Sequence, residues 1–229
     1  MDISKNLIRI PLFSSLSEDE IAEIRRCMEI RAFKKRETIF SEGDPPSRFF
    51  VLISGKVKIT KMSHEGKEII IELISKGDFF GGFAVLKGFP YPANAVAMED
   101  SSVLRIGRPD LLRIIERFPN IMYQITAHLS ERVREFPDTL KNIALERVES
   151  RISSLLLKLA EKTGKKTATG ETEIDMKLTK QDIAEMVGTT VETSIRVMSR
   201  LTKAGLIKNT GGRIIIRDRK GLLAAVNPS

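Results

Sequence analysis

The sequence predicts an α+β fold in three parts: an N-terminal antiparallel β-barrel (1–118), a long helix (119–146) and a C-terminal winged helix-turn-helix (147–229). Three patterns indicate these parts. Short β-rich runs alternate with glycines, apolar residues then recur at helical spacing from Asn120, and two short helical patterns joined by a glycine precede a hairpin pattern.

Positive charge is concentrated at one end of the chain. The net charge is +8, and residues 150–229 hold 15 of the 38 basic and 8 of the 30 acidic residues, a net of +7. A basic C-terminal third of this kind indicates a polyanionic partner. No apolar run is long enough for a signal peptide or a membrane helix, so we expect a cytoplasmic protein that does not enter membranes.

Few residues are available for metal or redox chemistry. Cys27 is the single cysteine, which excludes a disulfide framework and a four-cysteine iron–sulfur or zinc site within one chain. His64 and His128 are the only histidines. The sequence also lacks a P-loop, a dinucleotide fingerprint and a nucleophile elbow, so we do not expect an enzyme.

The first part combines a short helix with the barrel. Ser17 is placed to cap a helix that would include Cys27. Strands are expected in RFFVLIS (48–54), KVKITKM (56–62), KEIIIELI (67–74) and NAVAMEDSSVLRIG (94–107), with SHEGKE (63–68) as a hairpin tip. The intervening GGFAVLKGFPYPANA (81–95) is expected to be a loop shaped for an anion, in which Lys87 carries the one charge.

The helix from Asn120 carries an apolar stripe at spacings of three and four, which is typical of a coiled-coil seam and predicts a homodimer. The seam comprises Ile121, Ile125, Leu129, Val133, Phe136, Leu140 and Ile143. The alternative is a helix that packs against its own barrel. Pro137 lacks an N–H and crowds the preceding turn, so the helix is expected either to kink or to end there.

Two short helices follow in LTKQDIAEMVGTTVETSIRVMSRLTKAGLI (178–207). Thr179 and Asp182 resemble a capping box at the start of the first helix. Gly188 can adopt the left-handed conformation that ends this helix, and Thr190 is placed to cap the next one. Within a basic domain, this pattern indicates a helix-turn-helix.

The second of these helices has two distinct faces. It is expected to bury Ser194, Val197, Met198 and Leu201 and to expose Glu192, Ile195, Arg196 and Ser199. Arginine can donate two hydrogen bonds to guanine and glutamate can accept one from cytosine, so Glu192 and Arg196 suit base recognition. The alternatives are a surface ion pair between the two and an apolar stripe of Val191, Ile195 and Met198.

The helix-turn-helix has flanking segments of different character. ERVESRISSLLLKLAEK (146–162) predicts an amphipathic helix, and TGKKTATGETEID (163–175) is expected to be a polar linker. GLIKNTGGRIIIRD (205–218) predicts a hairpin wing. Lys208 and Arg213 flank its tip and could contact phosphates.

This order of parts resembles, over essentially the whole chain, the cyclic-AMP receptor protein/fumarate–nitrate regulator (CRP/FNR) family of bacterial transcription factors. The matching motifs are IFSEGDPPSRFFVLISGKVKI (39–59), GDFFGG (77–82) and VGTTVETSIRVMSRLTKAGLI (187–207). The resemblance implies a cyclic-nucleotide-binding-like jelly roll and a homodimer that binds double-stranded DNA, contacts RNA polymerase and responds to a small-molecule effector. The competing class, a regulatory module controlling an enzyme or channel, is opposed by the helix-turn-helix and the basic C-terminus.

The resemblance also implies roles on DNA. Glu192 and Arg196 would read the central G·C pairs of each half-site, and Ile195 would face the DNA. Phosphate contacts are expected from Lys180, Gln181, Thr190, Thr193, Ser199, Lys208 and Arg213. Family members with Glu-x-x-Ser-Arg read TTGAT and the cyclic-AMP branch reads TGTGA. An isoleucine at 195 favours a thymine methyl, so a TTGA-like palindrome is expected.

The nucleotide contacts of the family are missing. Residues 81–82 are Gly-Gly where the cyclic-AMP branch has Gly-Glu, and residues 93–94 are Ala-Asn where it has Arg-Ser or Arg-Thr. Phe136 and Pro137 stand where the long helix would touch the adenine. Burying a phosphate without its arginine is unfavourable, so no response to cyclic AMP is expected. The single cysteine excludes the iron–sulfur cluster of the oxygen-sensing branch.

An apolar, aromatic effector pocket is expected instead. Its lining would be Phe79, Phe80, Gly81, Gly82, Phe83, Phe89, Tyr91, Ala93, Asn94 and Phe136. This pattern resembles the haem-dependent nitric-oxide regulators of the Dnr and HcpR types, with His64, His128, Tyr91 or Met62 as candidate haem ligands. Another hydrophobic ligand and a sealed core without a ligand are the alternatives. A kink at Pro137 would let pocket occupancy alter the alignment of the long helices.

Overall fold

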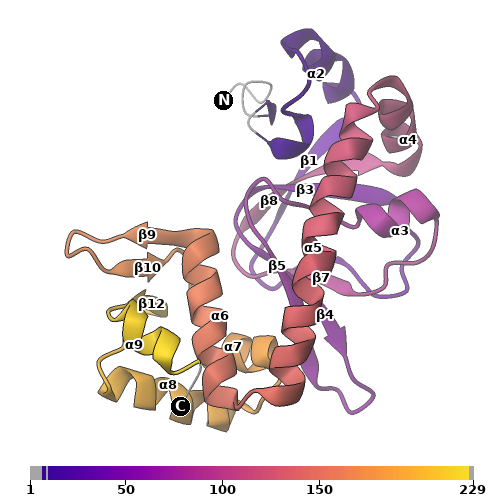
Figure 1. The fold of residues 1–229 in the computed structure, drawn as a ribbon. Helices are drawn as coiled ribbons and strands as arrows, with labels where there is room; N and C mark the ends of the chain where they lie inside the picture. Colours follow the sequence, from indigo (N-terminus) through magenta and orange to yellow (C-terminus); the bar gives the residue numbers. More distant parts are fainter. Residues whose placement is uncertain (1–6, 9, 227–229) are drawn as a thin grey trace. The chain divides into compact units, whose positions relative to one another are not determined.

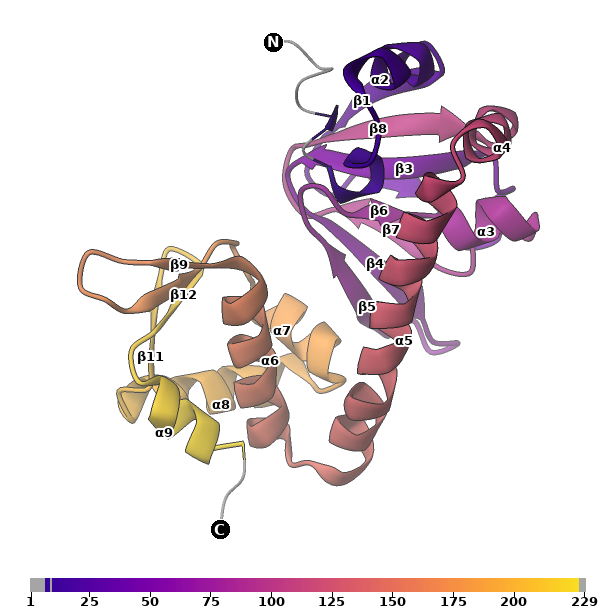
Figure 2. The same ribbon diagram turned by 45° about the horizontal axis from the view of Figure 1, so that its top comes forward.

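The computed structural model describes residues 7, 8 and 10–226, apart from the side chains of 135, 136, 138, 139 and 142–144. The chain divides into two compact units, Met1–Arg134 and Glu135–Ser229, and each has its own sheet structure (Figures 1 and 2). The predicted α+β fold is confirmed. None of the helices in the described ranges is long and apolar enough to cross a membrane.

The first unit is built on two four-stranded antiparallel sheets, with strand orders β1-β8-β3-β6 and β2-β7-β4-β5. The strands are β1 (Met28–Phe33), β2 (Thr38–Phe40), β3 (Arg48–Ser54), β4 (Val57–Met62), β5 (Glu68–Ile74), β6 (Phe79–Phe80), β7 (Asn94–Ala97) and β8 (Ser101–Gly107). The predicted strands match β3, β4, β5 and the β7–β8 pair, because alternating patterns and glycine turns are strong local signals.

Five helical segments accompany these sheets: η1 (Pro11–Phe13), α2 (Glu18–Arg25), α3 (Gly82–Lys87), α4 (Arg108–Arg117) and α5 (Asn120–Leu145). The predicted cap of α2 is confirmed, since Ser17 Oγ accepts from the Glu20 N–H and the Ser17 N–H donates to Glu20 Oε2 at 2.8 Å. However, α2 ends at Arg25, and Cys27 lies in the turn before β1 instead of on the helix.

The segment 81–95 is not wholly the loop that its sequence predicts, because Gly82–Lys87 forms helix α3. Gly81 (φ 74°) and Gly88 (φ 79°) take left-handed conformations at its two ends, which glycine adopts at little cost. A Cβ added at Gly82 would lie 2.8 Å from Phe49 Cε2. The glycine pair is therefore explained by a turn and a close helix–sheet contact, without an anion.

Helix α5 packs against its own barrel through the first part of the predicted dimer seam. Ile121 and Ile125 are buried in the barrel core, and Leu129 packs partly buried against it. Assigning these three to a seam was wrong, because a heptad-like stripe does not distinguish packing on a sheet from packing on another helix. Val133 and Leu140 are exposed, whereas the side chains of Phe136 and Ile143 lie outside the described residues.

Pro137 does not end this helix, since α5 runs from Asn120 to Leu145 with Pro137 inside it. A proline in a helix interior removes one backbone hydrogen bond and costs about 3 kcal/mol. The exposed position of Pro137 leaves water able to hydrogen-bond to the carbonyl that loses its partner.

The second unit combines four helices with one antiparallel sheet. The helices are α6 (Val148–Thr163), α7 (Lys180–Val187), α8 (Val191–Lys203) and α9 (Arg219–Ala224). The strands, in sheet order, are β11 (Ile207–Thr210), β12 (Arg213–Ile216), β10 (Thr172–Ile174) and β9 (Gly164–Lys166). The predicted wing is confirmed as the β11–β12 hairpin, with Gly211 and Gly212 at positive φ.

The polar segment 163–175 is not a plain linker. It forms the β9–β10 hairpin, and β10 extends the wing sheet by pairing with β12, Thr172 opposite Ile216. Polar composition suggested a linker because the pairing partner of β10 lies more than forty residues further along the chain, where a local pattern carries no signal of it.

Gly55 gives a test of the barrel core. Gly43 and Gly55 have nearly the same φ, 88° and 90°, but a Cβ at Gly55 would lie 2.2 Å from Ser101 Oγ, whereas one at Gly43 meets nothing within 4 Å. Gly43→Ala should cost about 1–2 kcal/mol of unfolding free energy through backbone strain alone. Gly55→Ala should cost about 1–3 kcal/mol more through overpacking.

Denaturant unfolding followed by tyrosine fluorescence measures this difference. The chain has no tryptophan, and its two tyrosines, Tyr91 and Tyr123, both lie in the first unit, so the signal reports on that unit alone. Equal losses for the two variants would contradict the contact with Ser101.

Candidate nucleic-acid interface and sensor site

Local hydrogen bonds fix both ends of the helix-turn-helix. Thr179 and Asp182 form the predicted capping box of α7: the Asp182 N–H donates to Thr179 Oγ1 at 3.0 Å and the Thr179 N–H donates to Asp182 Oδ2 at 2.7 Å. Gly188 ends α7 in the left-handed conformation, with φ 68°. The Thr193 N–H then donates to Thr190 Oγ1 at 3.2 Å, which caps α8. The turn is thus specified by the residues within it.

Helix α8 buries one face and presents the other to solvent. The buried residues are Ser194, Val197, Met198 and Leu201, and the exposed ones include Glu192, Ile195, Arg196 and Ser199. Both sets agree with the sequence prediction. The alternative stripe was wrong, because Met198 is buried while Val191 and Ile195 are exposed. An isoleucine that is 46% exposed on such a face is available to an apolar group of a partner.

The charged groups at the start of α8 are held in ordered positions. Hydrogen bonds from its own backbone N–H and from Thr190 lower the pKa of Glu192, and the nearby charge of Arg196 lowers it further. Arg196 Nη2 donates to Thr193 Oγ1 at 3.2 Å. The N-terminus of α8 therefore presents the ionised carboxylate of Glu192 next to the guanidinium of Arg196, which is hydrogen-bonded to Thr193.

The residues expected to contact phosphates differ in their surroundings. Lys180 opens α7 and is half-buried, and this burial lowers its pKa from the usual 10.5. Gln181 Nε2 donates to Glu185 Oε1 at 2.8 Å. Lys208 is exposed on β11, whereas Arg213 Nη1 donates to Glu173 Oε1 at 2.6 Å. Lys208 is accordingly the less constrained cation of the wing.

The aromatic residues of the first unit form a buried cluster. Tyr91 stacks on Phe40 with ring centroids 4.0 Å apart, and Phe50 stacks on Phe80 at 5.2 Å. Phe79 is also buried, at 5.4 Å from Phe49. The sequence prediction missed Phe40 and Phe50, although both lie in the motif 39–59, because it took the pocket lining from residues 79–94 and from Phe136 of the long helix.

Phe83 and Phe89 lie apart from this buried cluster. Phe83, on α3, is 53% exposed and meets Phe89 edge-on with ring centroids 5.2 Å apart. The structure therefore brings Phe80 and Tyr91 together with Phe40 and Phe50, places Phe79 against Phe49 and His128 instead, and leaves Phe83 at the surface. Its exposure follows from α3, which turns this side chain outward where an extended loop was expected.

The residues at the expected nucleotide contacts already have partners within the protein. Ala93 is buried, and Asn94 Oδ1 accepts from the Glu42 N–H at 2.8 Å. Tyr91 Oη donates to the Arg48 carbonyl oxygen and accepts from the Arg48 N–H at 3.1 Å. Burial raises the pKa of Tyr91, so its hydroxyl keeps the proton that it donates.

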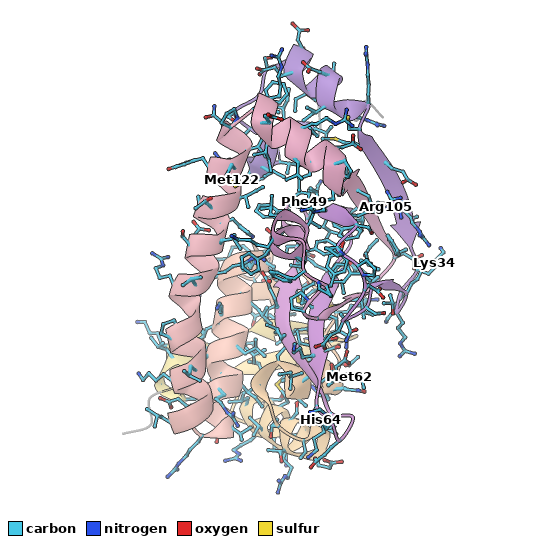
Figure 3. All side chains as sticks on the ribbon, turned by 90° about the vertical axis from the view of Figure 1, so that its right-hand side faces the viewer. Lys34, Phe49, Met62, His64, Arg105 and Met122 are labelled. Carbon is cyan, nitrogen blue, oxygen red and sulfur yellow. The ribbon has the colours of Figure 1, made fainter. Side chains whose placement is uncertain are left out.

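The candidate haem ligands lie in different environments. His64 and Met62 are exposed at the β4–β5 hairpin, where Figure 3 labels them. His128, on α5, packs against Phe79 with ring centroids 4.5 Å apart. Over the described ranges, no group of three or more His, Cys, Asp or Glu residues could hold a metal ion.

A barrel followed by a long helix and a winged helix-turn-helix is the arrangement of a DNA-binding transcriptional regulator. Two family models match the chain: the cyclic nucleotide-binding domain over residues 30–118 and the Crp-like helix-turn-helix domain over residues 150–225. The global nitrogen regulator of Synechococcus elongatus is 30% identical over 201 residues, 82% of this chain and 86% of the relative. The chain belongs to the CRP/FNR family of transcriptional regulators.

Other similarities extend over nearly the full length. The CRP-like cAMP-activated global transcriptional regulator of Mycobacterium tuberculosis is 27% identical over 216 residues, 94% of this chain and 96% of the relative. The structure of FixK2 from Bradyrhizobium japonicum has a TM-score of 0.75 at 22% identity, covering 85% of this chain and 95% of that one, and so supports the fold alone. These relatives are regulators and leave the effector of this chain open.

Proposed function

We propose that the protein is a homodimeric regulator that reads a TTGA-like palindrome through α8, under the control of an effector other than cyclic AMP. One observation carries the DNA part of this proposal: α8 exposes Glu192, Ile195 and Arg196 while its opposite face is buried. As a regulator of this family, it would act in the cytoplasm and contact RNA polymerase.

The exposed face of α8 suits three kinds of base contact. Arg196 can donate two hydrogen bonds to guanine O6 and N7. The lowered pKa of Glu192 keeps its carboxylate ready to accept from cytosine N4. Ile195 offers only apolar contact, which favours a thymine methyl over a polar base edge. Lys180, Gln181, Thr190, Thr193, Ser199, Lys208 and Arg213 would add contacts that position the protein on the phosphates.

Arg196→Ala should weaken binding to a TTGA-type palindrome by about 1–3 kcal/mol per half-site, because one bidentate base contact is lost. Arg200→Ala is the matched control: Arg200 lies on the same helix but pairs with Glu149 at 2.8 Å, away from the reading face. Fluorescence anisotropy at several salt concentrations measures both. Tighter binding of the wild type to TGTGA than to TTGA sites would contradict the proposed half-site.

The homodimer would form through the face of α5 that points away from the barrel. Exposed residues recur there at spacings of three and four: Tyr123, Thr126, Ser130, Val133, Pro137 and Leu140. Tyr123 is 71% and Val133 70% exposed, unusual for large apolar groups. Thr126 and Ser130 hydroxyls donate to carbonyls four residues earlier on the same helix, at 2.9 Å each, so burying them leaves no donor unpaired.

Val133→Glu should convert the dimer to a monomer at micromolar concentration, because it places two carboxylates opposite each other in an apolar seam. Leu112→Glu is the control, an equal change at an exposed position of α4. Sedimentation velocity measures the mass of each. A Val133→Glu variant that remains as dimeric as the wild type would remove this seam.

An effector other than cyclic AMP is supported by the surroundings of three positions. Gly82 is pressed against Phe49, so an acidic side chain cannot be placed there for a ribose. Ala93 and Asn94 supply no cation for a phosphate. Relatives named for cyclic AMP share only 27–28% identity with this chain, so their ligand does not transfer to it. An apolar ligand that inserts among Phe80, Tyr91 and the Phe40 ring that both of them meet fits better.

Calorimetry should show no cyclic-AMP binding at micromolar concentration, since neither Ala93 nor Asn94 supplies a cation to compensate the cost of desolvating the phosphate. Micromolar binding would contradict the proposal.

Haem is the more specific candidate for the effector-binding group, with nitric oxide as its signal. If haem binds, titration should give a saturable Soret band at one haem per subunit. His128→Ala should abolish that band and His64→Ala should preserve it. A featureless anaerobic titration would remove haem.

A further inference from the structure

An open hollow of about 400 Å³ lies on the first unit, at residues to which the function above gives no role. Its polar lining includes Arg26, Glu29, Ser47, Arg48, Arg105 and Asp110. Glu29 comes from β1, Arg48 from β3 and Arg105 from β8, and β8 pairs with both other strands. Arg105 is labelled in Figure 3. The sheet register therefore brings distant cations together.

The three central side chains are unequally buried. Glu29 Oε2 lies 3.3 Å from Arg48 Nη1, and Glu29 Oε1 pairs with Arg105 Nη2. The Arg105 side chain is only 11% exposed and its buried Nε has no hydrogen-bond partner, whereas Glu29 is 57% exposed. The arginine is fixed and incompletely paired, whereas the glutamate is well hydrated, so Glu29 can leave for water when another anion takes its place beside Arg105.

The start of α4 borders the same hollow. Its N-cap is Gly107, another lining residue, but its first two residues offer no free N–H, because the Arg108 N–H donates to the Ser47 carbonyl at 3.0 Å and Pro109 has none. Asp110, in the first turn, pairs with Arg113 on the same helix, which offsets part of its charge. The hollow is thus lined by three arginines, Arg26, Arg48 and Arg105, and by two carboxylates, each already shared with an arginine.

We propose that this hollow binds a small solute through an oxyanion, a phosphate or carboxylate, that takes the place of the Glu29 carboxylate between Arg48 and Arg105. A planar guanidinium pairs with two oxygens of either group. Glu29 then acts as a tethered competitor that lowers the affinity of the site, so only a solute present at high concentration occupies it.

The hollow is connected to the aromatic cluster through one backbone segment. The Arg48 N–H and carbonyl both hydrogen-bond to Tyr91 Oη, and the Tyr91 ring stacks on Phe40. The carbonyl of the preceding residue, Ser47, accepts a hydrogen bond from the Arg108 N–H at 3.0 Å. The Arg108 side chain in turn donates from Nε to the Val85 carbonyl of α3. An anion held by Arg48 therefore acts on the same residues that would line the effector pocket.

Calorimetric titration of the full chain with inorganic pyrophosphate and, separately, with citrate tests the site and distinguishes a phosphate from a carboxylate ligand. Glu29→Gln should bind the preferred probe about tenfold more tightly than the wild type, because the competitor loses its charge. Arg105→Gln and Arg48→Gln should each bind the same probe at least tenfold more weakly than the wild type. Arg31→Gln is the control, since Arg31 lies on β1 but pairs with Glu37 outside the hollow.

Three results would overturn the proposal. The first is unchanged affinity in Glu29→Gln for both probes. The second is an equal loss in Arg31→Gln and Arg48→Gln, which would mean diffuse attraction to a basic protein. Anion binding by the basic second unit contributes the same background to every variant. Binding of a hexaglutamate peptide, but of neither small probe, through Arg48 and Arg105 would also overturn it in favour of a protein-docking surface.

Discussion

The attachment of α5 to its own barrel is the constraint on which the rest of the molecule depends. Ile121 and Ile125 are buried in the barrel core. Further along, Arg132 Nε lies 2.8 Å from Glu72 Oε1 of β5, and its Nη2 donates to the Phe79 carbonyl of β6 at 3.0 Å. A helix bound on one side by these contacts has its other face fixed as well, so the barrel decides which residues α5 can offer to a partner.

The contacts of β6 extend this constraint to the sensor region. Phe79 meets Phe49 on one side and His128 of α5 on another. Beyond it, a Cβ added at Gly81 would lie 3.2 Å from both the Phe50 and the Tyr91 ring. A ligand that separates these rings must move β6, and β6 is hydrogen-bonded to Arg132. A ligand bound there would therefore act on α5 through these contacts, and this route does not require a kink at Pro137.

The parts of the structure that could be predicted from the sequence are those specified by interactions between residues close together in the chain. The caps at Ser17, Thr179 and Thr190, and the faces of α8, are specified within four residues and were predicted correctly. The β9–β10 hairpin depends on pairing with β12 and was missed. Ile121, Ile125 and Leu129 were assigned to the seam for the same reason, since the pattern of α5 identifies an apolar face but not the surface that it covers.

The same contrast between local and long-range interactions explains why the DNA-binding face can be predicted from the sequence more directly than the effector site can. The DNA-reading face comprises neighbouring residues on α8, whose spacing alone places them together. The aromatic cluster instead joins Phe40 of β2, Phe50 of β3, Phe80 of β6 and Tyr91 of the turn before β7. Which rings meet depends on sheet order. Loss of a nucleotide-binding residue is visible in the sequence, but the shape that replaces it is set by the packed sheets.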